Sequence, residues 1–274
     1  MSESPFTRRS KKEIAELIDV ASGKTPADLC LDNCRIINVF SGEIIKGSVA
    51  IFRDRIAGVG PRYKAKKRLN LKGAYIAPGF IDAHFHLESS MVTIPEFTRA
   101  VLPSGTTSAV ADPHEIANVF GYDGIRFMLE SSKYNPMNFF FTMPSCVPPT
   151  VMETSGSSLS AFDIYPFLRE KWVVGLGEVM NYPNVLSCDH DLLDKISIYS
   201  EKRLEGHAPG VTGKALAGYI STGISSDHEA TNLKEAQEKL RLGMYVMIRE
   251  GSAAKNLADI LPLVKPENKS RFML

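Results

Sequence analysis

The stretch Ala77-Pro-Gly-Phe-Ile-Asp-Ala-His-Phe-His-Leu-Glu-Ser-Ser90 predicts a buried strand whose end presents two histidines. A Pro-Gly pair marks the start of the strand, and the Phe-Ile pair after it forms the apolar body. Side chains at positions i and i+2 of a strand point to the same face, so His84 and His86 can reach one metal ion, whereas a helix would separate them. An isolated His-x-His can equally be coincidental, and only further candidate ligands downstream distinguish the two interpretations.

After this stretch the chain alternates apolar strands with amphipathic helices. The predicted strands are residues 80–86, 107–112, 138–143, 172–178, 203–207, 224–227, 244–249 and one that begins at Arg271. The predicted helices are residues 121–134, 160–170, 192–200, 212–221, 233–242 and 253–263. Such alternation indicates a parallel sheet with helical crossovers. We therefore expect an α/β fold, a (β/α)8 TIM-like barrel that is incomplete at strand eight, with its active site at the carboxyl ends of the strands. A doubly wound open sheet is the alternative, although no G-x-G-x-x-G follows the first strand.

Two further regions precede the barrel. We expect an N-terminal arm and helix over residues 1–27, a partial β-sandwich over residues 28–75 and the barrel over residues 76–274. Ser10-Lys-Lys-Glu13 forms a capping box that opens a short helix, which ends near Gly23. Short strands with hairpin connections follow at residues 29–39, 47–52, 55–59 and 71–76. Because the chain stops within predicted strand eight, we expect a truncated protein or a fragment of a longer one.

The composition is that of an ordinary globular protein. Hydrophobic residues make up 44% and charged residues 23% of the 274 residues, and the net charge is +1. This balance indicates neither nucleic acid nor a membrane as a partner. The cysteines form no disulfide framework or CxxC pair, and the N-terminus lacks the apolar run of a signal peptide. We therefore expect a cytoplasmic protein.

Most of the histidines fall where a barrel places its chemistry. The residues at or just after predicted strand ends are His84, His86, His114, Glu178, His207 and His228. His190 lies in a predicted loop and reads as exposed surface. Imidazole nitrogens with a carboxylate suit zinc, manganese or iron, and a carboxylate that can bridge, Glu178, points to two ions. Two divalent cations that share a hydroxide supply a nucleophile near neutral pH, so the pattern predicts hydrolysis. No G-x-S-x-G offers a serine nucleophile instead.

The strand-one motif resembles that of the amidohydrolase superfamily, and further strings resemble the adenine deaminase family. These strings are Ala83-His-Phe-His-Leu-Glu-Ser-Ser-Met91, Asp112-Pro-His-Glu-Ile-Ala-Asn-Val-Phe-Gly121, Gly175-Leu-Gly-Glu-Val-Met180, Gly206-His-Ala-Pro-Gly210 and Ser226-Asp-His-Glu229. The resemblance implies hydrolysis of adenine to hypoxanthine and ammonia, as in purine salvage, and a homo-oligomer if the chain is complete. It also implies a binuclear divalent centre, manganese before iron or zinc, on the metal ligands His84, His86, Glu178, His207 and His228.

Further roles in catalysis and substrate binding are expected if this metal site forms. We expect Glu178 and His228 to be catalytic. Glu88 is a candidate to bind the purine ring or, alternatively, a carboxylate at a helix N-terminus. His114 is a candidate substrate contact or, alternatively, a helix cap. Arg249 is a candidate contact to the purine edge or, alternatively, a member of a structural ion pair at the barrel rim. Asp227 would fix the tautomer of His228 or cap the next helix.

Two alternatives stay open. Members of the superfamily carry a strand-eight aspartate that binds metal and moves the proton, and this chain ends before it, so the protein would be a catalytically inactive remnant. The other alternative is an amidohydrolase that acts on a cyclic amide or an N-acetyl sugar. Cyclic-amide members commonly bridge their metals with a carboxylated lysine on strand four, where this chain has Glu178.

Overall fold

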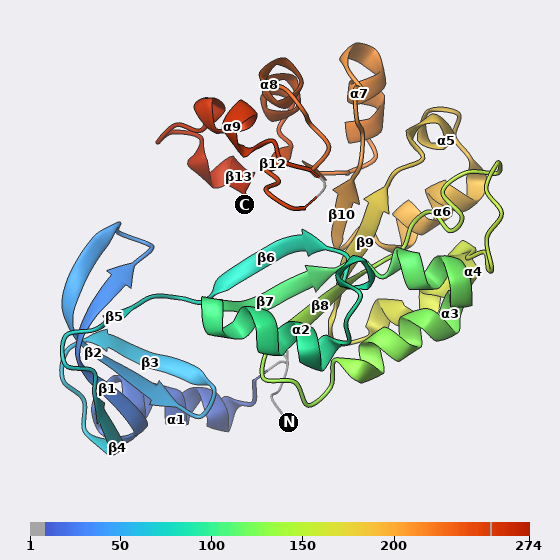
Figure 1. The fold of residues 1–274 in the computed structure, drawn as a ribbon. Coiled ribbons are helices and arrows are strands. Elements are labelled where there is room, and N and C mark those ends of the chain that lie inside the picture. The colour runs from blue at the N-terminus through green and yellow to red at the C-terminus, as the bar shows by residue number, and fades with distance from the viewer. Residues whose placement is uncertain (1–8, 253) are drawn as a thin grey trace. The chain divides into compact units, whose positions relative to one another are not determined.

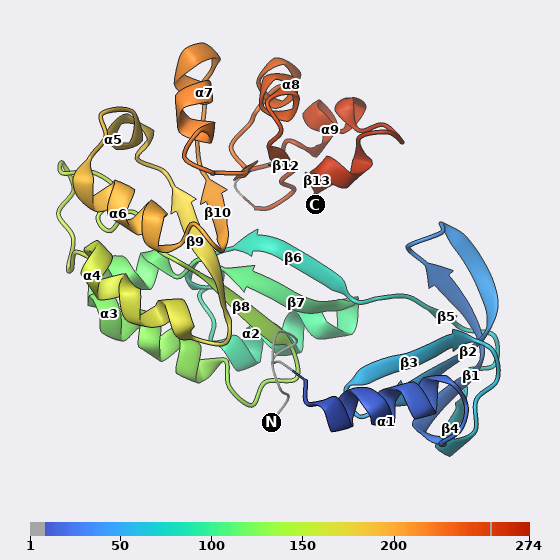
Figure 2. The same cartoon turned by 180° about the vertical axis from the view of Figure 1, so that it is seen from behind.

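The computed structural model describes residues 9–252 and 254–274 (Figures 1 and 2). The chain divides after Gly79 into two compact units. None of the described helices has the length and apolarity that crossing a lipid bilayer requires.

The N-terminal unit begins with the predicted capped helix, α1 (Lys11–Ala21). The Ser10 hydroxyl accepts a hydrogen bond from the Glu13 amide at 3.2 Å, and the Glu13 carboxylate accepts one from the Ser10 amide at 2.6 Å. These two bonds satisfy amide groups that a helix start leaves without partners, so the predicted capping box is confirmed. The helix buries Val20 against Ala27 and Ala50 of the sheet that follows.

That sheet has five strands, β1 (Ala27–Asn38), β2 (Glu43–Phe52), β3 (Arg55–Gly60), β4 (Ala65–Asn70) and β5 (Tyr75–Ile76). Its order is β3-β2-β1-β4, with β5 beside β1. The sequence did not predict β4, because three of its six side chains are charged, nearly all are exposed and they show no alternation. Parallel pairing to β1 and an ion pair of 2.6 Å between Arg68 and Asp32 hold it in place.

The second unit contains one parallel sheet of eight strands in chain order. The strands are β6 (Phe80–Phe85), β7 (Thr106–Ala111), β8 (Asn138–Met143), β9 (Val173–Val179), β10 (Arg203–Gly206), β11 (Ser226–Asp227), β12 (Tyr245–Met247) and β13 (Phe272–Met273). In Figures 1 and 2, β6 to β10 lie side by side in that order. Each strand pairs in parallel with the next, and this is the topology of a (β/α)8 barrel. The predicted barrel fold is confirmed. Among the described strands, β6 and β13 are the two edges of the sheet.

Helices connect the strands. They are α2 (Ile94–Val101), α3 (His114–Ser131), α4 (Ala161–Ile164), α5 (Tyr182–Leu186), α6 (His190–Ile198), α7 (Gly213–Ile220), α8 (Leu233–Arg241) and α9 (Leu257–Ile260), with 3₁₀ turns at Glu88–Ser90, Leu102–Ser104, Tyr165–Arg169, Leu261–Leu263 and Lys269–Arg271. α3 begins at His114 rather than at residue 121, because Gly121 is a kink with φ 55° inside the helix and not its start. α2 and α5 were not predicted. The predicted start of the last helix, residue 253, lies outside the described residues.

Apolar side chains from strands and helices form one large core in this unit. Its fully buried members include Phe141 and Leu176 on the strands and Leu216 and Tyr219 on α7. A dense interior of this kind fixes the strands against one another, so the side chains at the strand ends are held in defined positions.

Candidate metal centre

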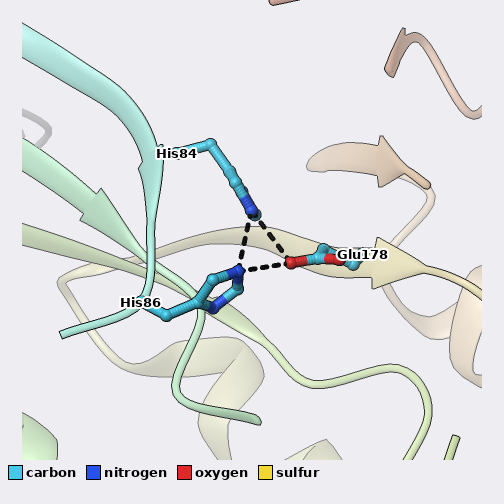
Figure 3. A group of neighbouring side chains, drawn as sticks. All are labelled: His84, His86 and Glu178. Atoms are coloured by element: carbon cyan, nitrogen blue, oxygen red, sulfur yellow. Dashed lines mark hydrogen bonds and ion pairs between the residues drawn. The ribbon is translucent and has the colours of Figure 1, made fainter. Parts of the chain in front are cut away.

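Four strands bring four imidazoles around one carboxylate. His84 lies in β6 and His86 just after it, Glu178 lies in β9, and His207 and His228 follow β10 and β11. Figure 3 shows His84, His86 and Glu178 pointing toward one another. One oxygen of Glu178, Oε1, lies 2.9 Å from Nε2 of His84 and 2.6 Å from Nε2 of His86. The two Nε2 atoms are 3.3 Å apart.

The other oxygen of Glu178 faces the second pair of imidazoles. Its Oε2 lies 2.6 Å from Nδ1 of His207 and 3.4 Å from Nε2 of His228. The two imidazole nitrogens are 3.2 Å apart. The carboxylate therefore divides the histidines into two pairs, and each pair shares one carboxylate oxygen.

This donor set fits a pair of divalent metal ions. Two nitrogens bound to one tetrahedral ion at ~2.0–2.1 Å lie roughly 3.3 Å apart, which is the spacing within each imidazole pair. Three donors from His84, His86 and Glu178 lie within 4.8 Å of one another, and so do three from Glu178, His207 and His228. A carboxylate with one oxygen in each group is placed to bridge two ions.

The charges of the cluster favour a cation. Burial alone would raise the pKa of Glu178, but hydrogen bonds from His207, His228, His84 and His86 hold it far below its usual value. Burial alone would lower the pKa of His84, but its hydrogen bonds to Glu178 and Glu205 raise it to about 10. Glu178 is 2% exposed, so its negative charge is screened by little water and must be balanced by positive charge nearby.

Asp112 supports the site from the end of β7. Its Oδ2 accepts a hydrogen bond from the Glu178 amide at 3.0 Å, and its backbone oxygen lies 3.0 Å from Nδ1 of His86. Gly177 makes this contact possible, because a Cβ at that position would lie 2.1 Å from Asp112 Oδ2. The glycine before Glu178 is thus required by the close approach of two strands.

We expect Gly177→Ala to destabilise the protein by about 1–3 kcal/mol, because the added methyl group must displace the Asp112 carboxylate from the Glu178 amide. Urea denaturation followed by tryptophan fluorescence measures the change. Gly251→Ala is the matched control, since a Cβ there meets its nearest atom at 3.8 Å. Equal stability of the two variants would contradict the packing argument.

Two of the predicted substrate-binding residues lie beside the first imidazole pair. His114 begins α3, and its Nδ1 lies 3.7 Å from Asp112 Oδ1 and 4.0 Å from Glu178 Oε1. Burial would lower the pKa of His114, but Asp112 raises it to about 9. Glu88 accepts a hydrogen bond from the Ile116 amide in the first turn of α3 at 3.0 Å. Its carboxylate therefore lies at a helix N-terminus, which is one of the two roles considered for it. Its Oε2 is buried without a hydrogen-bond partner among the described residues.

The third, Arg249, follows β12 and forms an ion pair at the rim. Both of its terminal nitrogens contact the carboxylate of Glu229, a residue that the sequence analysis did not select. Glu229 Oε1 in turn lies 3.6 Å from Nε2 of His228 and 3.9 Å from Nδ1 of His207. Arg249 therefore contacts Glu229, and Glu229 lies beside the second imidazole pair.

The proposed contact of Asp227 with His228 is wrong. Asp227 accepts hydrogen bonds from the amides of Ala208, Glu229 and Ala230 and from Lys239, at 2.7–3.0 Å. Nδ1 of His228 is buried with no hydrogen-bond partner among the described residues. The turn after β11 folds back on Asp227, so its carboxylate is used by the backbone and by α8 rather than by the imidazole.

The sequence analysis also missed Glu205, whose Oε2 lies 3.1 Å from Nδ1 of His84. In the predicted strand 203–207 it lies two residues before His207, a spacing that places both side chains on one face but does not identify His84 as the partner. His190 is exposed as predicted, but it begins α6 instead of lying in a loop. A cavity of about 600 Å³ is lined by His84 and His228 together with residues of β6, β12 and β13.

Known proteins resemble this chain in sequence. Residues 75–269 match the Amidohydrolase family. The adenine deaminase of Kosmotoga olearia is 50% identical over 258 residues, which are 93% of this chain and 45% of that protein. Adenine deaminase 2 of Carboxydothermus hydrogenoformans is 50% identical over 260 residues, 95% of this chain and 45% of that protein. The chain spans about half the length of the curated relatives it matches.

Solved structures share the fold. A beta-aspartyl dipeptidase from Fervidobacterium islandicum AW-1 aligns with TM-score 0.60 and 13% identity over 90% of this chain and 72% of that one. An N-acyl-D-glutamate deacylase from Bordetella bronchiseptica, complexed with zinc and a phosphonate inhibitor, aligns with TM-score 0.52 and 15% identity over 82% of this chain and 58% of that one. The resemblance to adenine deaminases is confirmed by the sequence comparisons. The chain therefore belongs to the amidohydrolase family, which implies a divalent metal at the His/Glu groups described above.

Proposed function

We propose that this chain carries the metal-binding site of an adenine deaminase, which hydrolyses adenine to hypoxanthine and ammonia. The observation that supports this most is the carboxylate of Glu178 between two imidazole pairs. The identity of 50% to adenine deaminases across nearly the whole chain supports the substrate. Glu178 on strand four, in place of a lysine, favours this reaction over hydrolysis of a cyclic amide.

Five side chains would hold the metal ions. His84 and His86 with Glu178 Oε1 would bind one ion, and His207 and His228 with Glu178 Oε2 the other. A pair of divalent ions lowers the pKa of bound water and so supplies a hydroxide nucleophile at neutral pH. We propose Mn²⁺ as the metal, with Fe²⁺ and Zn²⁺ as alternatives, because imidazole and carboxylate donors suit all three.

The remaining residues would bind and orient the purine. Attack at C6 builds negative charge on the ring nitrogens, and a protonated group must stabilise it. His114 is the candidate donor, since its Nδ1 is buried beside the first imidazole pair without a hydrogen-bond partner among the described residues. The unpartnered Oε2 of Glu88 can accept from the amino group of adenine. Arg249 would act indirectly, by holding Glu229 beside the second imidazole pair. We assign a catalytic role to His228, a member of that pair.

Two wider aspects are proposals from the sequence. We propose a cytoplasmic location and a homo-oligomeric assembly for the complete protein. Its partner would be a small purine and not nucleic acid, which the net charge of +1 supports.

The proposed function predicts a metal-dependent release of ammonia from adenine. We expect turnover after Mn²⁺ is supplied to the purified chain and loss of turnover when a chelator removes it. His207→Ala is expected to lower turnover by at least ~100-fold, because it removes a ligand, while His190→Ala, at an exposed position, leaves turnover unchanged. The rate of ammonia release and the absorbance change from adenine to hypoxanthine measure the turnover. Turnover of a cyclic amide or an N-acetyl sugar instead of adenine would contradict the substrate, and metal-free inactive protein would favour the inactive remnant.

A further inference from the structure

Glu205 is a buried acid that the proposed reaction does not use. It lies in β10 two residues before His207, so both side chains point to the same face of the strand. Gly206 between them allows β11 to pack closely, since a Cβ there would lie 2.4 Å from the Ser226 backbone oxygen. The carboxylate is thus held inside the barrel unit, where the residue is 7% exposed.

The partner of this carboxylate is one of the candidate ligands. Glu205 Oε2 lies 3.1 Å from Nδ1 of His84, and Nε2 on the other side of the ring faces Glu178 Oε1 at 2.9 Å. An ionised carboxylate can only accept a hydrogen bond, so Glu205 keeps a hydrogen of His84 on Nδ1, and a metal ion would replace the proton on Nε2, which faces Glu178. A carboxylate behind a metal-binding imidazole also makes that imidazole a stronger ligand.

The two imidazole pairs differ in this support. In the first pair, Nδ1 of His84 has a carboxylate and Nδ1 of His86 has the backbone oxygen of Asp112 at 3.0 Å. In the second pair, Nδ1 of His228 is buried without a hydrogen-bond partner among the described residues. Both rings of the first pair are therefore held through their Nδ1 atoms, whereas Nδ1 of His228 contributes no hydrogen bond to the orientation of the second pair.

A purely structural role explains Glu205 poorly. An isolated carboxylate is costly to bury, and an apolar side chain of the same size would fill the space without that cost. The side-chain contact that Glu205 makes with another residue is to the His84 imidazole, at 3.1 Å. Among the described residues, the contact with His84 is what offsets the cost of burying this carboxylate. We therefore explain the presence of Glu205 by its effect on the His84 imidazole.

We infer that Glu205 is a positioning residue that orients His84 and makes the His84 and His86 pair the tighter of the two metal sites. This rests on the proposed metal centre and adds an order of loading to it: the ion at His84 and His86 binds first, and the ion at His207 and His228 binds second.

The test is a titration of the metal-free 274-residue chain with Mn²⁺, in which the electron paramagnetic resonance signal of free Mn²⁺ gives the affinity of each ion. We expect two ions to bind the unchanged protein with different affinities. Glu205→Leu is expected to weaken the tighter site by ~10–100-fold and to leave the weaker site within a few-fold. Glu201→Gln, at an exposed position just before β10, is the control and should change neither.

Each outcome separates the inference from the function it rests on. If the unchanged protein binds two ions and Glu205→Leu binds both with unchanged affinity, or loses both equally, the role of Glu205 is wrong while the metal centre stands. If the unchanged protein binds no Mn²⁺, the proposed function fails and the inference with it. Should Glu205→Leu not fold, Glu205→Gln, which keeps the shape but not the charge, decides in its place: at least a tenfold loss at the tighter site supports the role, and unchanged affinity overturns it.

Discussion

Glu178→Gln is expected to abolish the binding of both metal ions and to lower adenine turnover by at least ~10³-fold. Each oxygen of Glu178 faces a different imidazole pair, so both proposed ions depend on this one carboxylate. An amide has the same shape, but it is neutral and only one of its two terminal atoms can bind a metal. Metal content after dialysis and the rate of ammonia release measure the two effects.

A second measurement on the same variant needs no metal. The pKa of His84 is raised to about 10 by its hydrogen bonds to Glu178 and Glu205, against the effect of burial. Removing the charge of Glu178 should lower this pKa in the metal-free protein, which nuclear magnetic resonance of the ring protons would detect. Glu170→Gln, which removes a half-buried carboxylate paired with Arg126 at 2.8 Å rather than with an imidazole, is the matched control. Retention of two ions by Glu178→Gln would contradict a bridging role.

The barrel was predictable because its sequence pattern and its topology agree. Short apolar strands between amphipathic helices allow few arrangements, and parallel strands expose their carboxyl ends at one edge. This rule placed six residues at one edge in advance: His84, His86, His114, Glu178, His207 and His228. The choice of metal ligands among them came from the resemblance to adenine deaminases. The elements that were missed lack such a pattern. Three of the six side chains of β4 (Ala65–Asn70) are charged and show no alternation. The start of α3 was obscured by Gly121, whose kink reads as a helix boundary.

The contacts of single polar side chains were less predictable. Asp227 next to His228 suggested a hydrogen bond to the imidazole, but three amides and Lys239 take that carboxylate instead. Glu205 was overlooked, because a carboxylate within a strand reads as solvent-facing until the opposite strand is placed. A partner 121 positions away in sequence, His84, is fixed only by tertiary packing.

Lys239 carries the largest stability effect that we expect outside the metal centre. It lies in α8 with 0% exposure, and its Nζ donates to Asp227 at 2.7 Å, to Glu235 at 2.8 Å and to the Ala208 backbone oxygen at 2.7 Å. Asp227 is also 0% exposed. Lys239→Met keeps the length and apolar stem but leaves the carboxylate buried without its cation, so we expect a loss of ~3–5 kcal/mol in the free energy of unfolding.

Trp172, the single tryptophan, lies in the barrel unit and reports its unfolding in urea. Lys234→Met on the same helix is the matched control, because Lys234 is exposed and its replacement should stay within about 0.5 kcal/mol. Asp227 also ties the turn after β10 to the end of β11, through the Ala208 amide at 2.8 Å. Since His207 and His228 flank these two points, a folded Lys239→Met protein should bind the second ion more weakly and the first ion normally. A loss below 1 kcal/mol would show that Asp227 is stabilised by the three backbone amides alone, and that the buried lysine does not hold this side of the site.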